Sequence, residues 1–354
     1  MNTAKRLQKL RDRLSDKGSA ALLVSQPENR YYLSGFNGSA GYLLITADQS
    51  FLITDSRYIE QATQQAPYYQ LFEKKTALCQ WLPEFVRSLA LSELAFEAEH
   101  TSFWHYNQLK DIVEPLEITL KPVNNLVETL RVIKDADELA LIEQAVSISD
   151  AAIEHIHHTG RPGMSELEMS WEIEKYMRCH GSQTIPFEVI VAAGHNSAMP
   201  HHRPCEYIIQ ENEPVVIDIG AKCGEYVSDL TRTLCYGQED EQFSHIYGIV
   251  LQAQMAAEGN IRTEMSGSEA DSQARSVIEA AGYGDKFRHS LGHGFGLAIH
   301  EAPLIGATSQ DIMQNGMVFT IEPGIYLPGW GGVRIEDSVI LENGRIRTLS
   351  VARK

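Results

Sequence analysis

Apolar residues near the start of the chain recur at helical spacing. Leu7, Leu10 and Leu14 follow one another at steps of three and four, which predicts an amphipathic helix over residues 3–17 that Gly18 ends. Further apolar patterns predict strands at 20–24, 42–45, 51–53 and 94–96 and helices at 57–65, 79–91 and 102–112. This alternation of strands and helices is typical of an α/β domain.

The second part of the chain begins with long helical patterns and then turns mainly to strands. The pair Asn124–Asn125 interrupts the pattern, so we expect two domains, 1–124 and 125–354. Ser165, with Glu168 three residues later, has the form of a capping box at the start of a helix. The pattern predicts helices at 135–158, 165–180, 240–258 and 267–281 and strands at 189–192, 215–219, 226–235, 318–321 and 333–341. We therefore expect an α+β second domain.

Length and charge narrow the possible partners. A chain of 354 residues favours two domains. The net charge is 30 − 47 = −17, which argues against nucleic acid and anionic membrane surfaces, because basic patches recognise both. No apolar run approaches the roughly 20 residues of a membrane helix, and the basic N-terminal segment lacks the apolar stretch of a signal peptide. We expect a cytoplasmic protein.

The cysteines indicate neither a disulfide framework nor a thiolate metal site. Their number is odd, and no CxxC motif occurs. We interpret them as small buried apolar side chains. The five are Cys79, Cys179, Cys205, Cys223 and Cys235.

Four carboxylates and one histidine in the second domain have the order and spacing of a two-metal hydrolase site. They are Asp218 in VVIDIG, Asp229 in SDLTRT, His293 in LGHGFG, Glu322 in TIEPGIY and Glu336 in VRIEDS. Acids beside apolar strand residues repel one another and resist the loss of their hydration. Two divalent ions would cancel that charge and supply a catalyst.

Each of these residues has a simpler interpretation when it is considered alone. Asp218 and Asp229 flank a turn, and they lie either on one face of a buried hairpin or on a solvated surface hairpin. His293, between two glycines, is either a metal ligand or a structural histidine, and Glu336 could simply face water. The combined pattern favours the metal site, and mostly oxygen ligands with one imidazole suit Mn²⁺, Co²⁺ or Zn²⁺.

Longer motifs carry a resemblance to a known family. They are RYYLSGFNGSAGYLLIT (30–46), FLITDSRYIEQA (51–62), LRVIKDADELALIEQA (130–145) and GHNSAMPHHRP (194–204). With the five-residue pattern, they make the chain resemble the Xaa-Pro peptidase branch of the pita-bread metallopeptidases, which includes aminopeptidase P and prolidase. The resemblance implies a creatinase-like α/β N-terminal domain followed by an α+β pita-bread catalytic domain.

The resemblance also implies a role for each site residue. Asp218 would chelate one ion, His293 with Glu322 the other, and Asp229 and Glu336 would bridge both. Two divalent ions are therefore expected per chain, with Mn²⁺ favoured and Co²⁺ or Zn²⁺ also suitable. Water on such an ion can fall in pKa to about 7 and become a nucleophile at neutral pH.

Residues around the metals complete the implied site. His201 and His300 would hydrogen-bond the substrate carbonyl or the tetrahedral intermediate, and Glu322 would shuttle the proton. His202 is the alternative to His201, because either could occupy the family's histidine position. Three further residues match positions around the ligands or the substrate, namely His289, Tyr326 and Arg334. Arg334, two residues before Glu336, would share its strand face and orient carboxylates.

The preferred function is that of an Xaa-Pro aminopeptidase acting on peptides with proline in second position. The alternative is an Xaa-Pro dipeptidase (prolidase), and a distant one is a non-enzymatic pita-bread module that binds partners. After HEAP this chain has Leu304, where many prolidase-like relatives have an arginine that would suit a substrate carboxylate. That departure tilts the interpretation toward the aminopeptidase. The family commonly forms homo-oligomers, so we expect a homodimer.

Overall fold

The computed structural model describes residues 2–354, and the chain divides into two compact units between Arg131 and Val132. The boundary therefore lies later than the expected break at Asn124–Asn125. The intervening residues belong to the first unit, because Val127 and Leu130 are buried there and the Tyr32 hydroxyl donates a hydrogen bond to the Leu130 carbonyl. The domain boundary is thus set by the burial of apolar side chains in the first unit. Asn124 and Asn125 only precede the turn before the last short helix of that unit.

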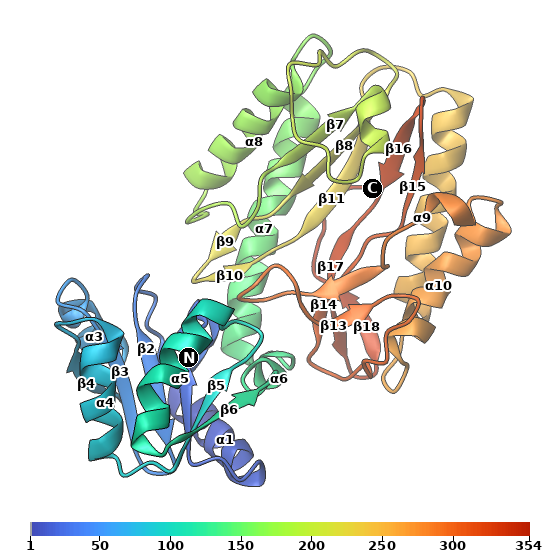
Figure 1. Ribbon diagram of the computed structural model, residues 1–354. Coiled ribbons are helices and arrows are strands. Elements are labelled where there is room, and N and C mark those ends of the chain that lie inside the picture. Colours follow the sequence, from blue (N-terminus) through green and yellow to red (C-terminus); the bar gives the residue numbers. More distant parts are fainter. Residues whose placement is uncertain (1) are drawn as a thin grey trace. The chain divides into compact units, whose positions relative to one another are not determined.

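The first unit is built on one six-stranded mixed sheet in the order β4-β3-β2-β1-β5-β6 (Figure 1). Its strands are β1 (Ala21–Val24), β2 (Tyr42–Thr46), β3 (Ser50–Thr54), β4 (Gln70–Glu73), β5 (Glu93–Glu97) and β6 (Thr119–Val123). Its helices are α1 (Thr3–Asp16), α2 (Pro27–Ser34), α3 (Ile59–Gln65), α4 (Leu78–Ser88), α5 (Phe103–Val113) and α6 (Glu128–Arg131). The two antiparallel pairings, β1 with β2 and β2 with β3, are those of consecutive strands, while the other three pairs are parallel.

Helix α2 and strands β4 and β6 were absent from the expected elements. Pro27 reads in sequence as the end of a strand, but it begins a helix, where its missing N–H breaks no intrahelical bond. Gly35 ends that helix with φ of 80°, a conformation that glycine adopts without strain. The two missed strands have partly exposed edge positions, so their apolar pattern is weak.

The second unit contains two sheets and four long helices (Figure 1). One sheet has the order β11-β8-β7 and the other β13-β12-β14-β17-β18, with the pairs β9/β10 and β15/β16 beside them. The helices are α7 (Ala136–Thr159), α8 (Glu166–Cys179), α9 (Glu241–Asn260) and α10 (Gly267–Ala280). The first strands are β7 (Ile190–Ala193), β8 (Pro214–Ile219), β9 (Lys222–Cys223), β10 (Tyr226–Val227), β11 (Leu230–Cys235) and β12 (Gly292–Gly294). The last are β13 (Glu301–Ile305), β14 (Val318–Ile321), β15 (Gly324–Leu327), β16 (Gly331–Arg334), β17 (Asp337–Glu342) and β18 (Arg345–Thr348).

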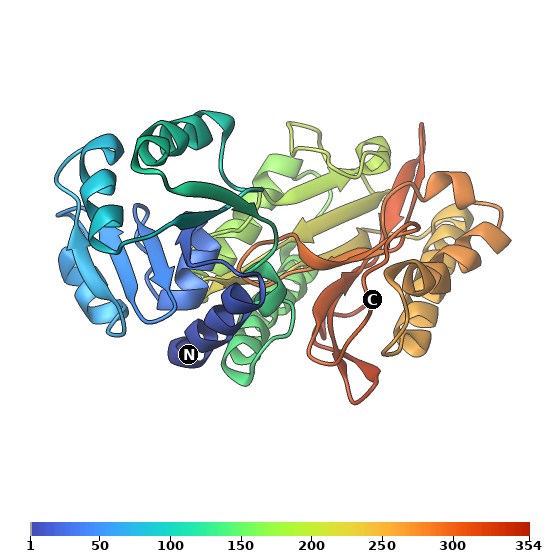
Figure 2. The ribbon, with the colours of Figure 1, turned by 60° about the horizontal axis from the view of Figure 1, so that its bottom comes forward.

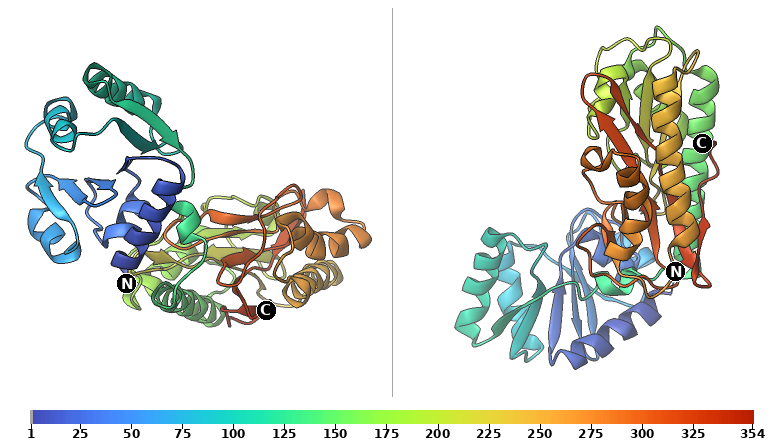
Figure 3. Two further views of the ribbon diagram at one scale, coloured as in Figure 1. Left: turned by 90° about the horizontal axis from the view of Figure 1, so that it is seen from below. Right: turned by 90° about the vertical axis from the view of Figure 1, so that its right-hand side faces the viewer.

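Each sheet of the second unit forms an apolar core with its own pair of helices. Helices α7 and α8 bury their apolar faces with the β11-β8-β7 sheet, and α9 and α10 do the same with the longer sheet (Figure 2). Figure 3 shows α7 and α9 running along the same side of the strands. This repetition of a helix pair with a sheet is the pita-bread arrangement, so the expected fold class is confirmed. Within residues 2–354, no helix has both the length and the apolar character that crossing a membrane requires.

Candidate metal centre

Strand β8 carries Asp218 into a buried setting. Its neighbours Ile217 and Ile219 are fully buried, and the carboxylate projects from the other face of the strand. Asp218 lies opposite Thr231 of β11, so Asp229, two positions before Thr231, falls on the same face as Asp218. The pairing register thus brings the two aspartates together, as the turn between them predicts.

Asp229 and Glu336 both lie where a strand is interrupted. The predicted continuous strands 226–235 and 333–341 are wrong, because each is broken in the middle. Asp229 lies in the gap between β10 and β11, and Glu336 lies in the gap between β16 and β17. Residues in the gaps form hydrogen bonds with neighbouring strands. The Glu336 amide donates to the Thr231 carbonyl of β11, and the Ser338 hydroxyl of β17 donates to the Asp229 carbonyl. The side chains of both residues reach the carboxylate of Asp218.

Carboxylate oxygens of Asp218, Asp229 and Glu336 all lie within 4.8 Å of one another. Asp229 is 6% exposed and Glu336 only 2%. Among the residues that the structure describes, no hydrogen-bond donor reaches the buried Oδ1 of Asp218. A buried carboxylate oxygen without a donor is costly unless a cation satisfies it.

His293 presents an unprotonated nitrogen to these acids. Its Nδ1 lies 3.1 Å from the Gly294 carbonyl, which can only accept, so Nδ1 carries the proton of the neutral ring. Its Nε2 lies 3.4 Å from Oε1 of Glu322 and 3.6 Å from Oδ2 of Asp229. Burial lowers the pKa of His293 to about 4, which keeps the ring neutral. A neutral imidazole with its second nitrogen tied to a carbonyl is suited to hold a metal ion.

The glycines beside His293 are required by close backbone contacts. A Cβ at Gly292 would lie 2.0 Å from the Thr320 carbonyl oxygen, and one at Gly294 would lie 2.1 Å from the Ala302 carbonyl oxygen. Neither backbone atom can move aside easily. The glycines therefore let β12 pack between its neighbours with His293 in place, as the sequence suggested.

Two threonines orient acids of the cluster and were not singled out from the sequence. The Thr231 hydroxyl donates to Oε2 of Glu336 at 2.6 Å, and the Thr320 hydroxyl donates to Oε1 of Glu322 at 3.1 Å. Thr320 also accepts a hydrogen bond from the His293 amide. The signal was an unusual polar residue on the buried face of an apolar strand, visible in LTRTLC and VFTIEP.

The electrostatics of the cluster call for added positive charge. Burial, reinforced by the neighbouring acids, raises the pKa of Asp229 and of Glu336 well above the ordinary value. Burial likewise raises the pKa of Glu322 to about 7. These shifts mean that the protein alone does not favour four ionised carboxylates here. The donor set, four carboxylates and one neutral imidazole, matches hard to borderline divalent ions such as Mn²⁺, Co²⁺ or Zn²⁺.

Arg334 is the cation that already lies in the cluster. Its Nη2 is 2.6 Å from Oδ2 of Asp218, so the carboxylate with which it pairs is that of Asp218. Nη1 also donates to the Tyr326 hydroxyl, which lies 3.0 Å from Nε2 of His289. Because Nδ1 of His289 faces the Ser290 carbonyl, that Nε2 accepts from Tyr326.

The remaining histidines divide between the centre and its surroundings. The His300 ring lies 4.3 Å from that of His293, between ring centres. His201 is exposed and close enough to His300 and His289 to influence their pKa values. His202 points away, with its Nε2 hydrogen-bonded to the buried Glu166 at 2.7 Å.

A buried ion pair fixes the loop that carries His300. Nζ of Lys134 lies 3.3 Å from Oε2 of Glu301, and both side chains are almost completely buried. The other oxygen of Glu301 accepts a hydrogen bond from the Ala298 amide at 2.8 Å. Both carboxylate oxygens of Glu301, the residue after His300, therefore have a partner that holds them in place.

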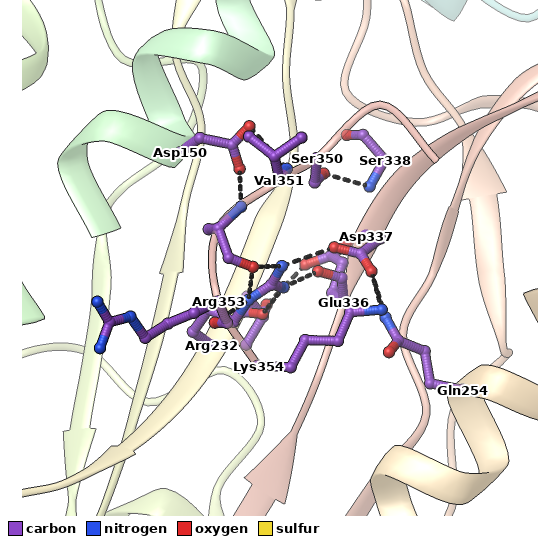
Figure 4. A network of polar contacts seen from close by, with 12 residues as sticks. Asp150, Arg232, Gln254, Glu336, Asp337, Ser338, Ser350, Val351, Arg353 and Lys354 are labelled. Atoms are coloured by element: carbon purple, nitrogen blue, oxygen red, sulfur yellow. Dashed lines mark hydrogen bonds and ion pairs between the residues drawn. The ribbon is translucent and has the colours of Figure 1, made fainter. Parts of the chain in front are cut away.

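A second polar network supports the gap that holds Glu336, and it was also missed in the sequence (Figure 4). The buried Arg232 on β11 donates to the Glu336 carbonyl and, at 2.7 Å, to the Asp337 carboxylate and to the Ala352 carbonyl. The amides of Val351 and Ala352 in turn donate to the Asp150 carboxylate on α7. Arg232 thus ties the strands that flank the candidate ligands to the chain's last residues.

Arg232→Met is expected to lower the free energy of unfolding by about 3 kcal/mol. The substitution removes the guanidinium from a buried ion pair and leaves buried carbonyls without donors. The measurement is urea unfolding of metal-free protein. Arg347→Met is the matched control, because Arg347 pairs with Glu143 and Glu342 on the surface and should cost less than about 1 kcal/mol. Equal losses for the two variants would contradict a structural role for Arg232.

Comparisons with protein families agree with this architecture. The model of metallopeptidase family M24 matches residues 140–343. The model of the creatinase/prolidase N-terminal domain matches residues 6–133.

Individual proteins match along the whole chain. An Xaa-Pro dipeptidase of Pyrococcus furiosus is 34% identical over 99% of this chain and 99% of its own length. The solved structure of an Xaa-Pro dipeptidase from Bacillus anthracis superposes with a TM-score of 0.96 at 37% identity, covering 100% of this chain and 99% of that one. An X-Pro aminopeptidase from Thermotoga maritima superposes with a TM-score of 0.88 at 34% identity, covering 95% and 96%. The chain belongs to metallopeptidase family M24, with a creatinase/prolidase N-terminal domain before its catalytic domain.

Proposed function

We propose that the protein is a two-metal Xaa-Pro peptidase that acts mainly on Xaa-Pro dipeptides. The observation that carries the proposal is the buried cluster of Asp218, Asp229 and Glu336, with His293 and Glu322 beside it. These acids have no sufficient protein cation, and their donor atoms suit divalent metal ions.

In this proposal, Asp218 would hold one ion and His293 with Glu322 the other, while Asp229 and Glu336 would serve both. When bound, the ions would polarise the scissile carbonyl and lower the pKa of water toward neutrality. Mn²⁺ is the expected ion, with Co²⁺ or Zn²⁺ as substitutes. Arg334 keeps Asp218 in place through its 2.6 Å ion pair.

The remaining residues handle the substrate and the proton. Glu322 accepts a proton from the attacking water and passes it to the leaving nitrogen of proline. His201 and His300 each donate a hydrogen bond toward the carbonyl oxygen, where negative charge develops. The pKa of His300 is lowered by burial, so its ring is neutral and still donates one N–H.

A proline substrate fits this set of residues. The bond before proline is a tertiary amide, so its nitrogen has no hydrogen for an enzyme to grip. The candidate site supplies carboxylates, histidines and metal positions around a carbonyl, and none of these requires that hydrogen. The alternative of a non-enzymatic binding module is disfavoured, because all five ligands are present.

The ranking of substrates departs from the expectation that we drew from the sequence. We expected an aminopeptidase first, but similar proteins that span the whole chain are Xaa-Pro dipeptidases, which supports the alternative. The aminopeptidase is the second candidate, because Leu304 stands where relatives offer an arginine. The similar T. maritima protein is named an X-Pro aminopeptidase, so proteins with this fold carry both names.

The environment of Leu304 weakens the argument against dipeptides. Leu304 on β13 lies opposite His293 on β12, so the two side chains share the face of the sheet that carries the site. It is 46% exposed. A substrate carboxylate near this position would stay partly hydrated, so it does not need a buried cation to offset its dehydration.

Metal-loaded protein is expected to cleave Xaa-Pro with higher kcat/KM than Xaa-Pro-Yaa-Zaa. Leu304→Arg should raise the dipeptide-to-tetrapeptide ratio of kcat/KM by about tenfold, which corresponds to about 1.4 kcal/mol. The reason is that a cation on this face attracts the carboxylate of the shorter substrate. Product analysis at matched concentrations measures both substrates.

Leu304→Gln is the control, because it adds polarity at similar size without charge. If the native protein prefers the tetrapeptide, the dipeptidase proposal is wrong and the aminopeptidase is the function. The homodimer stays a prediction that rests on the resemblance, and the cytoplasmic location stays one that rests on the sequence pattern.

A further inference from the structure

Glu166 is a fully buried carboxylate that lies outside the proposed metal ligands. It is the first residue of α8, and five donors converge on its two oxygens. Oε1 accepts from the Ala193 amide at 2.8 Å and the Asn196 side chain at 3.0 Å. Oε2 accepts from Nε2 of His202 at 2.7 Å, from the Cys205 amide at 3.1 Å and from the Cys205 thiol at 3.2 Å.

All five donors come from one segment, residues 193–205, which carries His201. The carboxylate contacts both ends of the segment, at Ala193 and Cys205, and also reaches its interior through Asn196 and His202. A single side chain therefore closes the segment into a loop around His201. Ordering thirteen residues this way would otherwise cost substantial conformational entropy.

The backbone of α8 gives this carboxylate a fixed position. The amide of Glu166 donates to the Tyr207 carbonyl, and the amide of Leu167 donates to the Cys205 carbonyl. These hydrogen bonds join the start of the helix to the C-terminal end of the segment and the residues just after it. The positive end of the helix also stabilises a carboxylate there.

On the other side of His201, the Pro200 carbonyl accepts from Nη1 of Arg334, the same guanidinium that pairs with Asp218. His201 is thus flanked by one anchor to the metal cluster and one to Glu166.

Glu166, His202 and Cys205 could also be considered as metal ligands, since their donor atoms lie within 4.8 Å of one another. Hydrogen bonding argues against that alternative. A carboxylate offers about four lone-pair positions, and five donors already occupy this one. The direct 2.7 Å contact between His202 and Glu166 is that of a hydrogen bond.

We propose that Glu166 is a positioning residue that holds His201 in its catalytic place by tying residues 193–205 to the start of α8. The inference rests on the proposed function, because it takes His201 as a group that contacts substrate. Glu166 itself is buried beneath the segment and acts only through it.

Glu166→Gln tests the proposal with little change in size. The amide turns an NH₂ group toward donors that need an acceptor, so at least two of the five hydrogen bonds are lost. We expect faster hydrogen exchange across residues 193–205, a fall in kcat of about tenfold or more with little change in KM, and unchanged metal content.

Glu168→Gln is the matched control, because Glu168 lies in the same first turn and its side chain accepts from the Ser165 amide. Among the described residues 2–354, no donor of the segment reaches it. This variant removes the same charge and should leave both exchange over 193–205 and kcat unchanged. His202→Ala is a milder variant that cuts one tie, and it should loosen the segment partially even where Glu166→Gln does not fold.

A double-mutant cycle separates positioning from general support. If Glu166 acts through His201, Glu166→Gln should lower kcat strongly in the native background and only slightly in His201→Ala. Equal fold-losses in both backgrounds would overturn the inference and leave the proposed function standing. Native exchange rates in Glu166→Gln and His202→Ala would overturn it without reference to activity.

The proposed function fails by a different observation. Metal-loaded native protein that cleaves no Xaa-Pro substrate refutes the function before any variant is compared. A silent His201→Ala in an active peptidase removes His201 from catalysis, and it overturns the present inference alone.

Discussion

Asp229→Ala and Glu336→Ala are each expected to remove both metal ions and to abolish peptidase activity. Each carboxylate is buried with its oxygens near those of Asp218, and in the proposed site each would serve both ions. Losing a shared ligand therefore weakens two sites at once, whereas Asp218→Ala should weaken mainly one. Metal analysis after dialysis, with assays on an Xaa-Pro dipeptide, measures the order of the effects.

Glu342→Ala provides the control for this prediction, because Glu342 is an exposed acid at the far end of β17, the strand that follows Glu336. It should keep full metal content and activity. Chelation should inactivate the native protein, and Mn²⁺ or Co²⁺ should restore it. Full activity in metal-free protein would refute the two-metal assignment.

The isosteric substitution Asp229→Asn should raise the thermal stability of the metal-free protein. Buried acids at Asp229 and Glu336 have raised pKa values because burial and neighbouring charges disfavour ionisation. Asp229→Asn removes one of these charges, so the Tm of metal-free protein should rise while metal binding is lost. A variant that loses activity but gains stability has not lost activity by misfolding.

His201→Ala and His300→Ala are expected to lower kcat by about 10²-fold, the size of effect seen when one oxyanion contact is removed. The ring of His300 lies against that of the proposed ligand His293, and His201 lies near His300, so each can reach a carbonyl bound at the metals. Metal content should stay at two ions per chain, because neither residue is a proposed ligand. Steady-state kinetics and metal analysis on the same samples test the prediction.

His195→Ala is the control, since His195 is an exposed histidine of the same segment that packs against Tyr207. It should leave kcat unchanged. His202→Ala should have a smaller effect than His201→Ala, because His202 points to Glu166. A silent His201→Ala together with a crippling His202→Ala would exchange the two assignments.

Local sequence patterns predicted most of the helices and the central strands. Ser165 with Glu168 predicted the start of α8, and the structure contains that capping box. The apolar run around Asp218 predicted β8, because a strand with buried neighbours needs such a pattern. Edge strands such as β4 and β6 were missed, since their exposed positions weaken the apolar signal.

Chemistry at the site was predictable where one residue contradicts its surroundings. An acid between two isoleucines at Asp218, or a histidine between two glycines at His293, requires a special explanation, and the sequence supplied a joint one. Thr231 and Thr320 carried a weaker signal of the same kind. Glu166 carried none, because a glutamate at the start of a helix is common and usually solvated.

The sequence by itself determined the division into an α/β part and a part of long helices and strands, and the set of candidate ligands, because these depend on residue type, periodicity and spacing. The pita-bread organisation followed from the resemblance of its motifs to a known family. Only the tertiary structure decided how Asp229 and Glu336 turn inward at breaks in their strands, and that Arg334 pairs with Asp218. It alone revealed that Glu166 gathers the segment around His201. Those contacts join residues far apart in the chain, and their geometry follows from how strands end and pack, which no local pattern encodes.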